Sequence, residues 1–185
     1  MHIMIDLETL GTRPGCAIAS IGAVAFDPNL GAVTETFYAA IDLDSCERAG
    51  LKAEIGTVGW WLRQGDAARA ALFENTEPLG HALERFALWF RRQGGREVWA
   101  HGATFDPPIL AAACEALGRP VPWRYPDVRD TRTLYALAGV QPRRDPATHH
   151  NALADAQAQA AAVIEAYAKL ARAETPAASA VEPAP

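Results

Sequence analysis

The stretch HIMIDLETLG occupies residues 2–11 and sets the centre of the predicted sheet. Its first part, residues 2–7, is a nearly continuous apolar run, as expected for a strand buried on both faces in the middle of a sheet. Asp6 places a charge inside this run, and Glu8 follows two positions later. Because residues two apart in a strand project from the same face, the two carboxylates are predicted to point at one spot.

Outward from this strand, the spacing of apolar residues predicts four more strands and a series of helices. The further strands are expected at residues 17–27, 32–41, 98–101 and 127–130, and the turn at 27–31 joins the first two in a hairpin. A helical pattern starts at Cys46, and longer helices are expected at residues 78–93, 107–117, 131–138 and 151–172. This order predicts an α/β domain in which helices flank a mixed five-stranded sheet with an antiparallel first half.

Length and composition indicate one domain. The 185 residues suit a single domain, predicted at residues 1–173, and the Ala- and Pro-rich residues 174–185 are predicted to be disordered. No apolar run reaches the ~20 residues that a membrane helix needs, which predicts a cytoplasmic protein with no membrane partner. The three cysteines, Cys16, Cys46 and Cys114, lack C-x-x-C spacing and are expected as buried thiols.

The formal net charge of −5 bears on the class of partner. A protein that grips long duplexes through their phosphates usually has a basic surface. An acidic chain suits instead a short stretch near a nucleic-acid end, with divalent metal ions supplying the positive charge beside phosphate. Asp6 and Glu8 offer the carboxylate oxygens that Mg²⁺ and Mn²⁺ prefer, and the alternative for this pair is a strand end that reaches solvent.

Three further residues are candidates for the same chemistry. Asp106 lies at a predicted strand-to-helix junction, where open sheets place ligand sites, although capping the helix would also explain it. Asp155 falls in the first turn of the last helix, where a carboxylate also favours the helix dipole. His150 is expected in the loop before that helix, where it can take a proton from an attacking water, and a solvated histidine is the alternative, for which His149 is a candidate.

The motifs DLETLG (6–11), HGATFD (101–106) and HNALADA (150–156) occur together and in this order. In this combination the sequence resembles the DEDDh superfamily of 3′-5′ exonucleases, from residue 3 to about residue 162. The resemblance implies a ribonuclease H-like fold, two divalent metal ions (Mg²⁺ or Mn²⁺), four metal-binding acids and a general base. These catalytic residues would be Asp6, Glu8, Asp106, Asp155 and His150. The sequence departs from many relatives at Gly102, where Asn is common, which affects a polar substrate contact and not the metal site.

A smaller subgroup is more similar still over residues 9–15, 57–64 and 99–106. It is the ribonuclease AS type of bacterial enzyme, together with related phage exonucleases. This resemblance implies a homodimeric exoribonuclease that acts on the 3′ end of single-stranded RNA and favours adenylate-rich ends.

Five residues are predicted to bind substrate: Thr9, Leu10, Gly11, Phe105 and Trp61. The first three match the segment that cradles the terminal nucleotide in the family. Phe105 either stacks on a base or fills the core. Trp60 and Trp61 are expected to divide between the core and the substrate path, and Trp61 is kept as the candidate contact.

Two other functions remain open at this point. A DNA exonuclease of the same fold would need the same metal site, because that site contacts phosphate, and the choice of sugar depends on contacts to the 2′-hydroxyl. A nucleic-acid-binding module without catalysis has no physical need for a cluster of repelling carboxylates. Metal-dependent release of mononucleotides would distinguish an enzyme from such a module.

Overall fold

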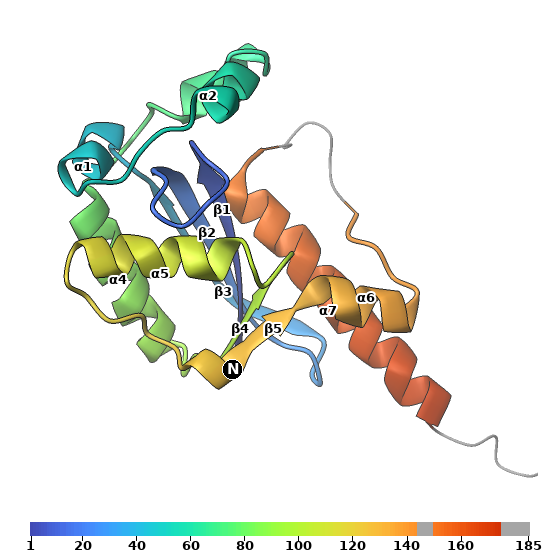
Figure 1. The fold of residues 1–185 in the computed structure, drawn as a ribbon. Coiled ribbons are helices and arrows are strands. Elements are labelled where there is room, and N and C mark those ends of the chain that lie inside the picture. Colours follow the sequence, from blue (N-terminus) through green and yellow to red (C-terminus); the bar gives the residue numbers. More distant parts are fainter. Residues whose placement is uncertain (144–149, 175–185) are drawn as a thin grey trace, which may run out of the picture.

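The computed structural model describes residues 1–143 and 150–174. One mixed sheet holds five strands in the order β3-β2-β1-β4-β5 (Figure 1). Their bounds are β1 (His2–Thr9), β2 (Ile18–Asp27), β3 (Ala32–Ala40), β4 (Glu97–Ala100) and β5 (Val128–Asp130). β1, β2 and β3 pair antiparallel, whereas β4 pairs parallel with both β1 and β5. The predicted α/β class, the mixed sheet and the central place of the first strand are confirmed.

Seven α-helices lie within the described residues, together with a 3₁₀ turn at Tyr125–Asp127. They are α1 (Leu43–Arg48), α2 (Ile55–Trp61), α3 (Asp66–Ala71), α4 (Leu79–Arg92), α5 (Asp106–Ala116), α6 (Thr131–Ala138) and α7 (Ala152–Glu174). The helical pattern that is predicted to start at Cys46 corresponds to three short helices, α1, α2 and α3. The predicted tail overlaps α7 at Glu174, and its remainder, 175–185, lies outside the described residues, as does most of the loop before His150. Within the described part of the chain, no helix combines the length and the hydrophobicity of a membrane span.

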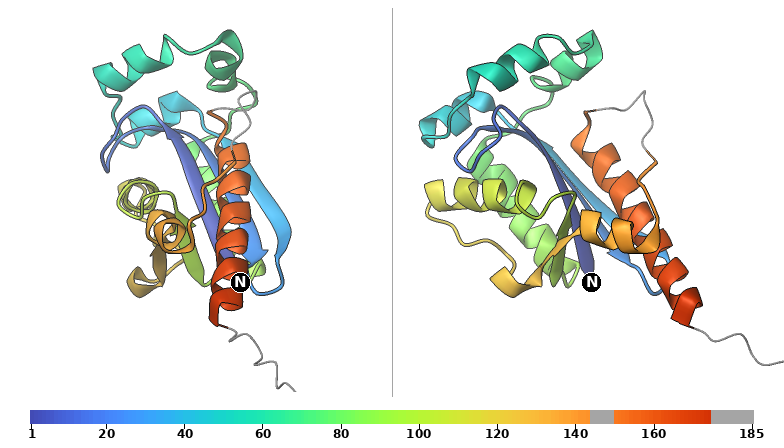
Figure 2. Two further views of the ribbon diagram at one scale, coloured as in Figure 1. Left: turned by 90° about the vertical axis from the view of Figure 1, so that its right-hand side faces the viewer. Right: turned by 45° about the vertical axis from the view of Figure 1, so that its right-hand side comes forward.

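The sheet separates two apolar cores. Helices α4 and α5 cover one face and α6 and α7 cover the other, which Figure 2 shows with the orange-red α7 lying along the strands. Side chains of β1 alternate between the two cores: Ile3, Ile5 and Leu7 join the first, and Met4 joins the second. By the same alternation Asp6 and Glu8 continue the row of Met4. The two acids therefore lie on the face that α7 covers.

Gly22 lets α7 come close enough to complete the site. It is paired with Asp6 across β1 and β2, and a Cβ built at this position would lie 2.2 Å from the backbone carbon of Ala152. No side chain can be accommodated at that distance without moving the start of the helix. The missing side chain of Gly22 thus sets how near Asp155, in the first turn of α7, lies to the sheet.

We expect Gly22→Ala to reduce both stability and activity. Overpacking of this kind costs about 1–3 kcal/mol, and a shift of about 1 Å in a catalytic group can lower turnover by about 10²-fold. Thermal melts and turnover measured on the same preparation test both effects. Gly80→Ala in α4 is the matched control, because its Cβ would meet Leu117 at an ordinary 3.6 Å. Equal melting temperatures for Gly22→Ala and the wild type would contradict the role of Gly22.

Candidate active site

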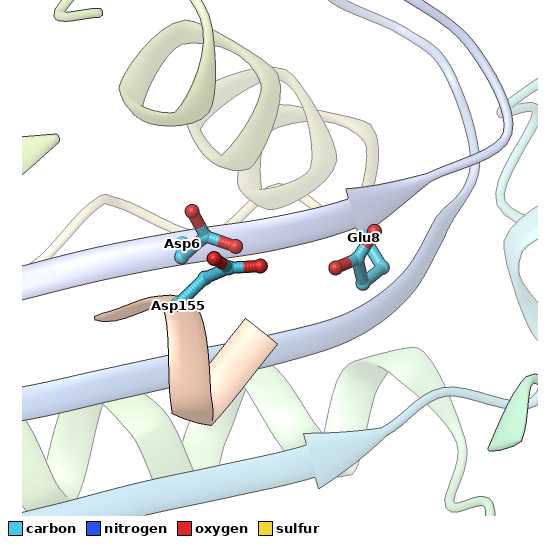
Figure 3. Close-up of side chains that lie close together, drawn as sticks. All are labelled: Asp6, Glu8 and Asp155. Carbon is cyan, nitrogen blue, oxygen red and sulfur yellow. The ribbon is translucent and has the colours of Figure 1, made fainter. Parts of the chain in front are cut away.

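Three carboxylates converge where β1 passes under the start of α7. Asp6, Glu8 and Asp155 each offer an oxygen, and these three atoms lie within 4.8 Å of one another. Figure 3 shows the Asp155 carboxylate reaching from the helix towards the two strand residues. Hard divalent cations bind carboxylate oxygens grouped in this way, because their charge offsets the mutual repulsion of the acids. The residues therefore fit a divalent metal ion.

The start of α7 is fixed by Asn151. Its side-chain oxygen accepts a hydrogen bond from the backbone N–H of Ala154 at 3.0 Å, and its carbonyl accepts one from Asp155 at 2.9 Å. Asn151 is therefore the N-cap of this helix, a position that asparagine favours. The cap and the bare backbone of Gly22 together hold Asp155 over the sheet.

Asp106 approaches β1 from the side of β4. The pairing of β1 with β4 extends only to Met4, and beyond it the backbone N–H of Leu7 donates to Oδ1 of Asp106 at 3.1 Å. Asp106 is buried and is the first residue of α5, whose cap residue Phe105 makes no side-chain cap bond. Asp106 is therefore not the N-cap residue of α5. Its carboxylate is directed to the strand between Asp6 and Glu8, although it is not within the group of three.

The pKa values of two of the acids, Asp6 and Asp106, are raised in the metal-free protein. Burial, with the neighbouring charges of Asp106 and Glu8, raises the pKa of Asp6 well above its ordinary value, and a hydrogen bond from Gln159 opposes the rise. Burial also raises the pKa of Asp106 to about 7, against the lowering effects of the Leu7 N–H and the Arg132 charge. Both shifts disfavour the ionised carboxyl in the metal-free protein. A bound cation would reverse that preference.

Gln159 is a site residue that the sequence analysis missed. Its side chain is fully buried in α7, and Nε2 donates to Oδ1 of Asp6 at 2.7 Å. The signal was present, because Gln159 follows Asp155 by four positions and such residues share one face of a helix. The bond fixes one oxygen of Asp6 and so directs the carboxylate within the cluster.

His150 lies against the tryptophan pair and not within the group of three carboxylates. Its ring meets Trp60 edge to face at a centroid distance of 4.7 Å and Trp61 at 6.0 Å. Its backbone is left-handed, with φ at 65°, a conformation that few residues other than glycine adopt. The predicted place just before α7 is confirmed. The catalytic role of His150 stays a prediction.

A pocket of about 560 Å³ opens beside Glu8. Four of the five residues predicted to bind substrate border it: Thr9, Gly11, Trp61 and Phe105. Leu10 does not, because its side chain packs against the apolar clusters and borders a different pocket. Gly11 cannot carry a side chain here, since a Cβ would lie 2.6 Å from that of Cys16.

The two tryptophans divide their roles. Trp61 is buried, and its Nε1 donates to the carbonyl of Thr9 at 2.9 Å. Trp60 is 37% exposed and lies between the pocket and His150. Trp61 thus supports the wall of the pocket from the core side, and Trp60 is the tryptophan with more surface to offer a ligand.

Comparison with known families and proteins gives a consistent picture. Residues 1–167 match the family model described as the 3′-5′ exoribonuclease Rv2179c-like domain. A protein of Enterobacteria phage T4 named exodeoxyribonuclease is 28% identical over 120 residues. That match covers 58% of this chain and 52% of the phage protein, so it spans only about half of the relative.

Solved structures show the same fold at low identity. Exonuclease X in complex with 5′ overhanging duplex DNA matches with a TM-score of 0.53 at 19% identity, covering 90% of each chain. The nuclease domain of 3′hExo, a DEDDh family member bound to rAMP, matches with a TM-score of 0.58 at 11% identity, and the match covers 92% of each chain. The E. coli ExoI–ssDNA complex matches with 0.62 at 17%, covering 95% of this chain and 41% of the other. The ribonuclease H-like fold of these exonucleases is therefore the fold of this chain.

Proposed function

Since the chain belongs to the family of 3′-5′ exoribonuclease Rv2179c-like domains, we propose that it is a metal-dependent exonuclease that removes nucleotides from the 3′ end of single-stranded RNA. The observation that supports this most is the meeting of Asp6, Glu8 and Asp155, with Asp106 on the adjoining strand edge, beside a pocket open to a ligand. Such a group of acids is needed by an enzyme that places metal ions against phosphate.

In the proposed site the four acids would hold two divalent cations, Mg²⁺ or Mn²⁺. When bound, such ions activate the attacking water and stabilise the charge on the leaving oxygen. Asp6 would be central to this set, because it groups with Glu8 and Asp155 and its carboxyl also feels the charge of Asp106. Gln159 holds one Asp6 oxygen, which leaves the other free to turn into the cluster.

The remaining steps fall to residues of the chain. We assign to His150 the role of general base, which accepts the proton released as water adds to phosphorus. The bond between phosphorus and the 3′ oxygen breaks, and that oxygen takes up a proton as the shortened strand leaves. The imidazole packs on Trp60 just before α7, and catalytic contacts often tighten only when substrate binds. The pocket walls of Thr9, Gly11 and Phe105 would hold the terminal nucleotide.

RNA is proposed over DNA because the family description names an exoribonuclease. A single strand is proposed over a long duplex because the net charge of −5 disfavours gripping the phosphates of a duplex. A DNA exonuclease is the second candidate, because the phage relative is named exodeoxyribonuclease. By the subgroup resemblance we also propose a preference for adenylate-rich ends and a homodimer, and we propose separately a cytoplasmic location.

Matched RNA and DNA oligonucleotides separate the two candidates. We expect faster shortening of single-stranded RNA than of DNA of the same sequence, and faster shortening of adenylate-rich 3′ ends. A contact that requires the 2′-hydroxyl produces such a difference, because a site built to bond a hydroxyl rejects a ligand that lacks it. Initial rates on 5′-labelled strands measure it. Equal or faster cutting of DNA would contradict the choice of RNA and leave the exonuclease proposal standing.

A further inference from the structure

An arginine fills the space beside Gly102 in the second motif. Gly102 has φ at +111°, and a Cβ built there would lie 3.2 Å from Nη1 of Arg132 and 3.3 Å from its Cζ. Arg132 belongs to the first turn of α6 and is exposed. The guanidinium thus occupies space beside the β4–α5 turn, and a side chain at position 102 would crowd it.

Asp130 fixes this arrangement from both sides. One carboxylate oxygen accepts from the backbone N–H of Ala103 at 2.7 Å, and the other accepts from that of Arg132 at 2.8 Å. A single side chain therefore ties the turn after β4 to the start of α6. These two hydrogen bonds of Asp130, and not a contact of the guanidinium, hold the backbone of Arg132 near Gly102.

The guanidinium of Arg132 is near enough to Asp106 to affect its pKa but forms no ion pair with a described carboxylate. It lowers the pKa of Asp106, yet within residues 1–143 and 150–174 no carboxylate comes into ion-pair range of its guanidinium. Most other arginines near carboxylates in this structure do form pairs, as Arg124 does with Asp127 at 2.7 Å. An exposed guanidinium next to a metal-binding cluster has its donors available for an anion.

We propose that Arg132 binds a backbone phosphate of the nucleic acid as the strand leaves the carboxylate cluster. The inference rests on the proposed function. Arginine presents several N–H donors in a planar fork that matches phosphate oxygens, and Gly102 leaves the space that this guanidinium occupies. In an acidic chain, one well-placed cation at the site supplies attraction for the strand that the overall charge does not.

The test compares the wild type with Arg132→Ala and Arg132→Lys, with Arg172→Ala as the control at the far end of α7. Kinetics on single-stranded RNA between about 50 and 200 mM salt give KM, kcat and the salt dependence of kcat/KM. We expect Arg132→Ala to raise KM about 10-fold with a smaller change in kcat, and to reduce the salt slope by about 0.7, the value of one phosphate contact on a single strand. Arg132→Lys should recover part of the slope, and Arg172→Ala should behave as the wild type.

A second measurement separates this inference from the activity. Fluorescence anisotropy of labelled RNA in EDTA reports binding without turnover. If the wild type binds RNA but degrades nothing, weaker binding by Arg132→Ala would keep the phosphate contact and overturn the enzyme. Unchanged binding, KM and salt slope in Arg132→Ala would overturn the contact, and so would a change confined to the pH profile, which would mean that Arg132 acts only on Asp106.

Discussion

Replacing Asp106 by Asn is expected to lower turnover by on the order of 10³-fold or more while leaving the fold intact. A catalytic metal ion contributes several kcal/mol to stabilising the transition state, and about 1.4 kcal/mol corresponds to tenfold in rate. The amide oxygen of Asn can still accept the bond from the Leu7 N–H, so the substitution removes charge without removing that contact. We expect losses of similar size for Asp6→Asn, Glu8→Gln and Asp155→Asn.

The same substitution should stabilise the metal-free protein in a pH-dependent way. The pKa of Asp106 is about 7 in the folded protein, against an ordinary value of 3.8. Between these values the folded state keeps a proton that the unfolded state has lost, so the wild type loses stability as the pH rises from about 4 to about 7. Asn cannot ionise. The gain in melting temperature should therefore be full above pH 7 and absent below about pH 4.

Thermal melts in EDTA across this pH range, with turnover measured in Mg²⁺, examine both effects. Glu115→Gln is the control, because Glu115 is an exposed residue of the same helix, and it should change neither. Near-normal turnover of Asp106→Asn would remove Asp106 from the metal site. A loss of turnover together with a lower melting temperature at every pH would show a structural defect instead.

His150→Ala should lower kcat by about 10² to 10⁴ and change KM little, as the loss of a general base does. An imidazole must be neutral to accept a proton, so the wild-type rate should rise with pH through the usual range of histidine and the variant should lose that rise. His149→Ala is the neighbouring control and should change the rate little. The opposite ranking of the two variants would mean that the base is His149.

Trp60 contacts His150 and also lines the pocket, so its substitution would have two effects at once. The His150 ring packs on it, so Trp60→Ala would release His150 as well as open the pocket. Removing the histidine leaves the pocket wall in place. His150→Ala therefore isolates the proton transfer, which a tryptophan substitution could not do.

The sheet and the carboxylate pair were predictable because they depend on local rules. The apolar run around Asp6 gave a buried central strand, and the period of two in a strand put Glu8 on the same face. The predicted helices at 131–138 and 151–172 end and begin at residues suited to those places: Gly139 is left-handed after the first, and Asn151 caps the second with its side chain. The motif resemblance added Asp106 and Asp155.

The rest depends on how distant segments meet. That Gly22 faces the backbone of Ala152 follows from the position of α7 on the sheet, which no local pattern encodes. The same holds for Arg132, whose place beside Gly102 depends on the two hydrogen bonds of Asp130 to the backbone. The division between Trp60 and Trp61 was open for the same reason, because both fit an amphipathic helix until its partners are known.

The most direct test of a metal-dependent 3′-5′ exonuclease follows the length of a 5′-labelled single-stranded RNA over time with wild-type protein and Mg²⁺ or Mn²⁺. We expect stepwise shortening from the 3′ end, no shortening in EDTA or with Asp155→Asn, and no shortening when the terminal 3′-hydroxyl is blocked. Strands that keep their full length in both metals, or a circular RNA that is cut internally, would contradict it.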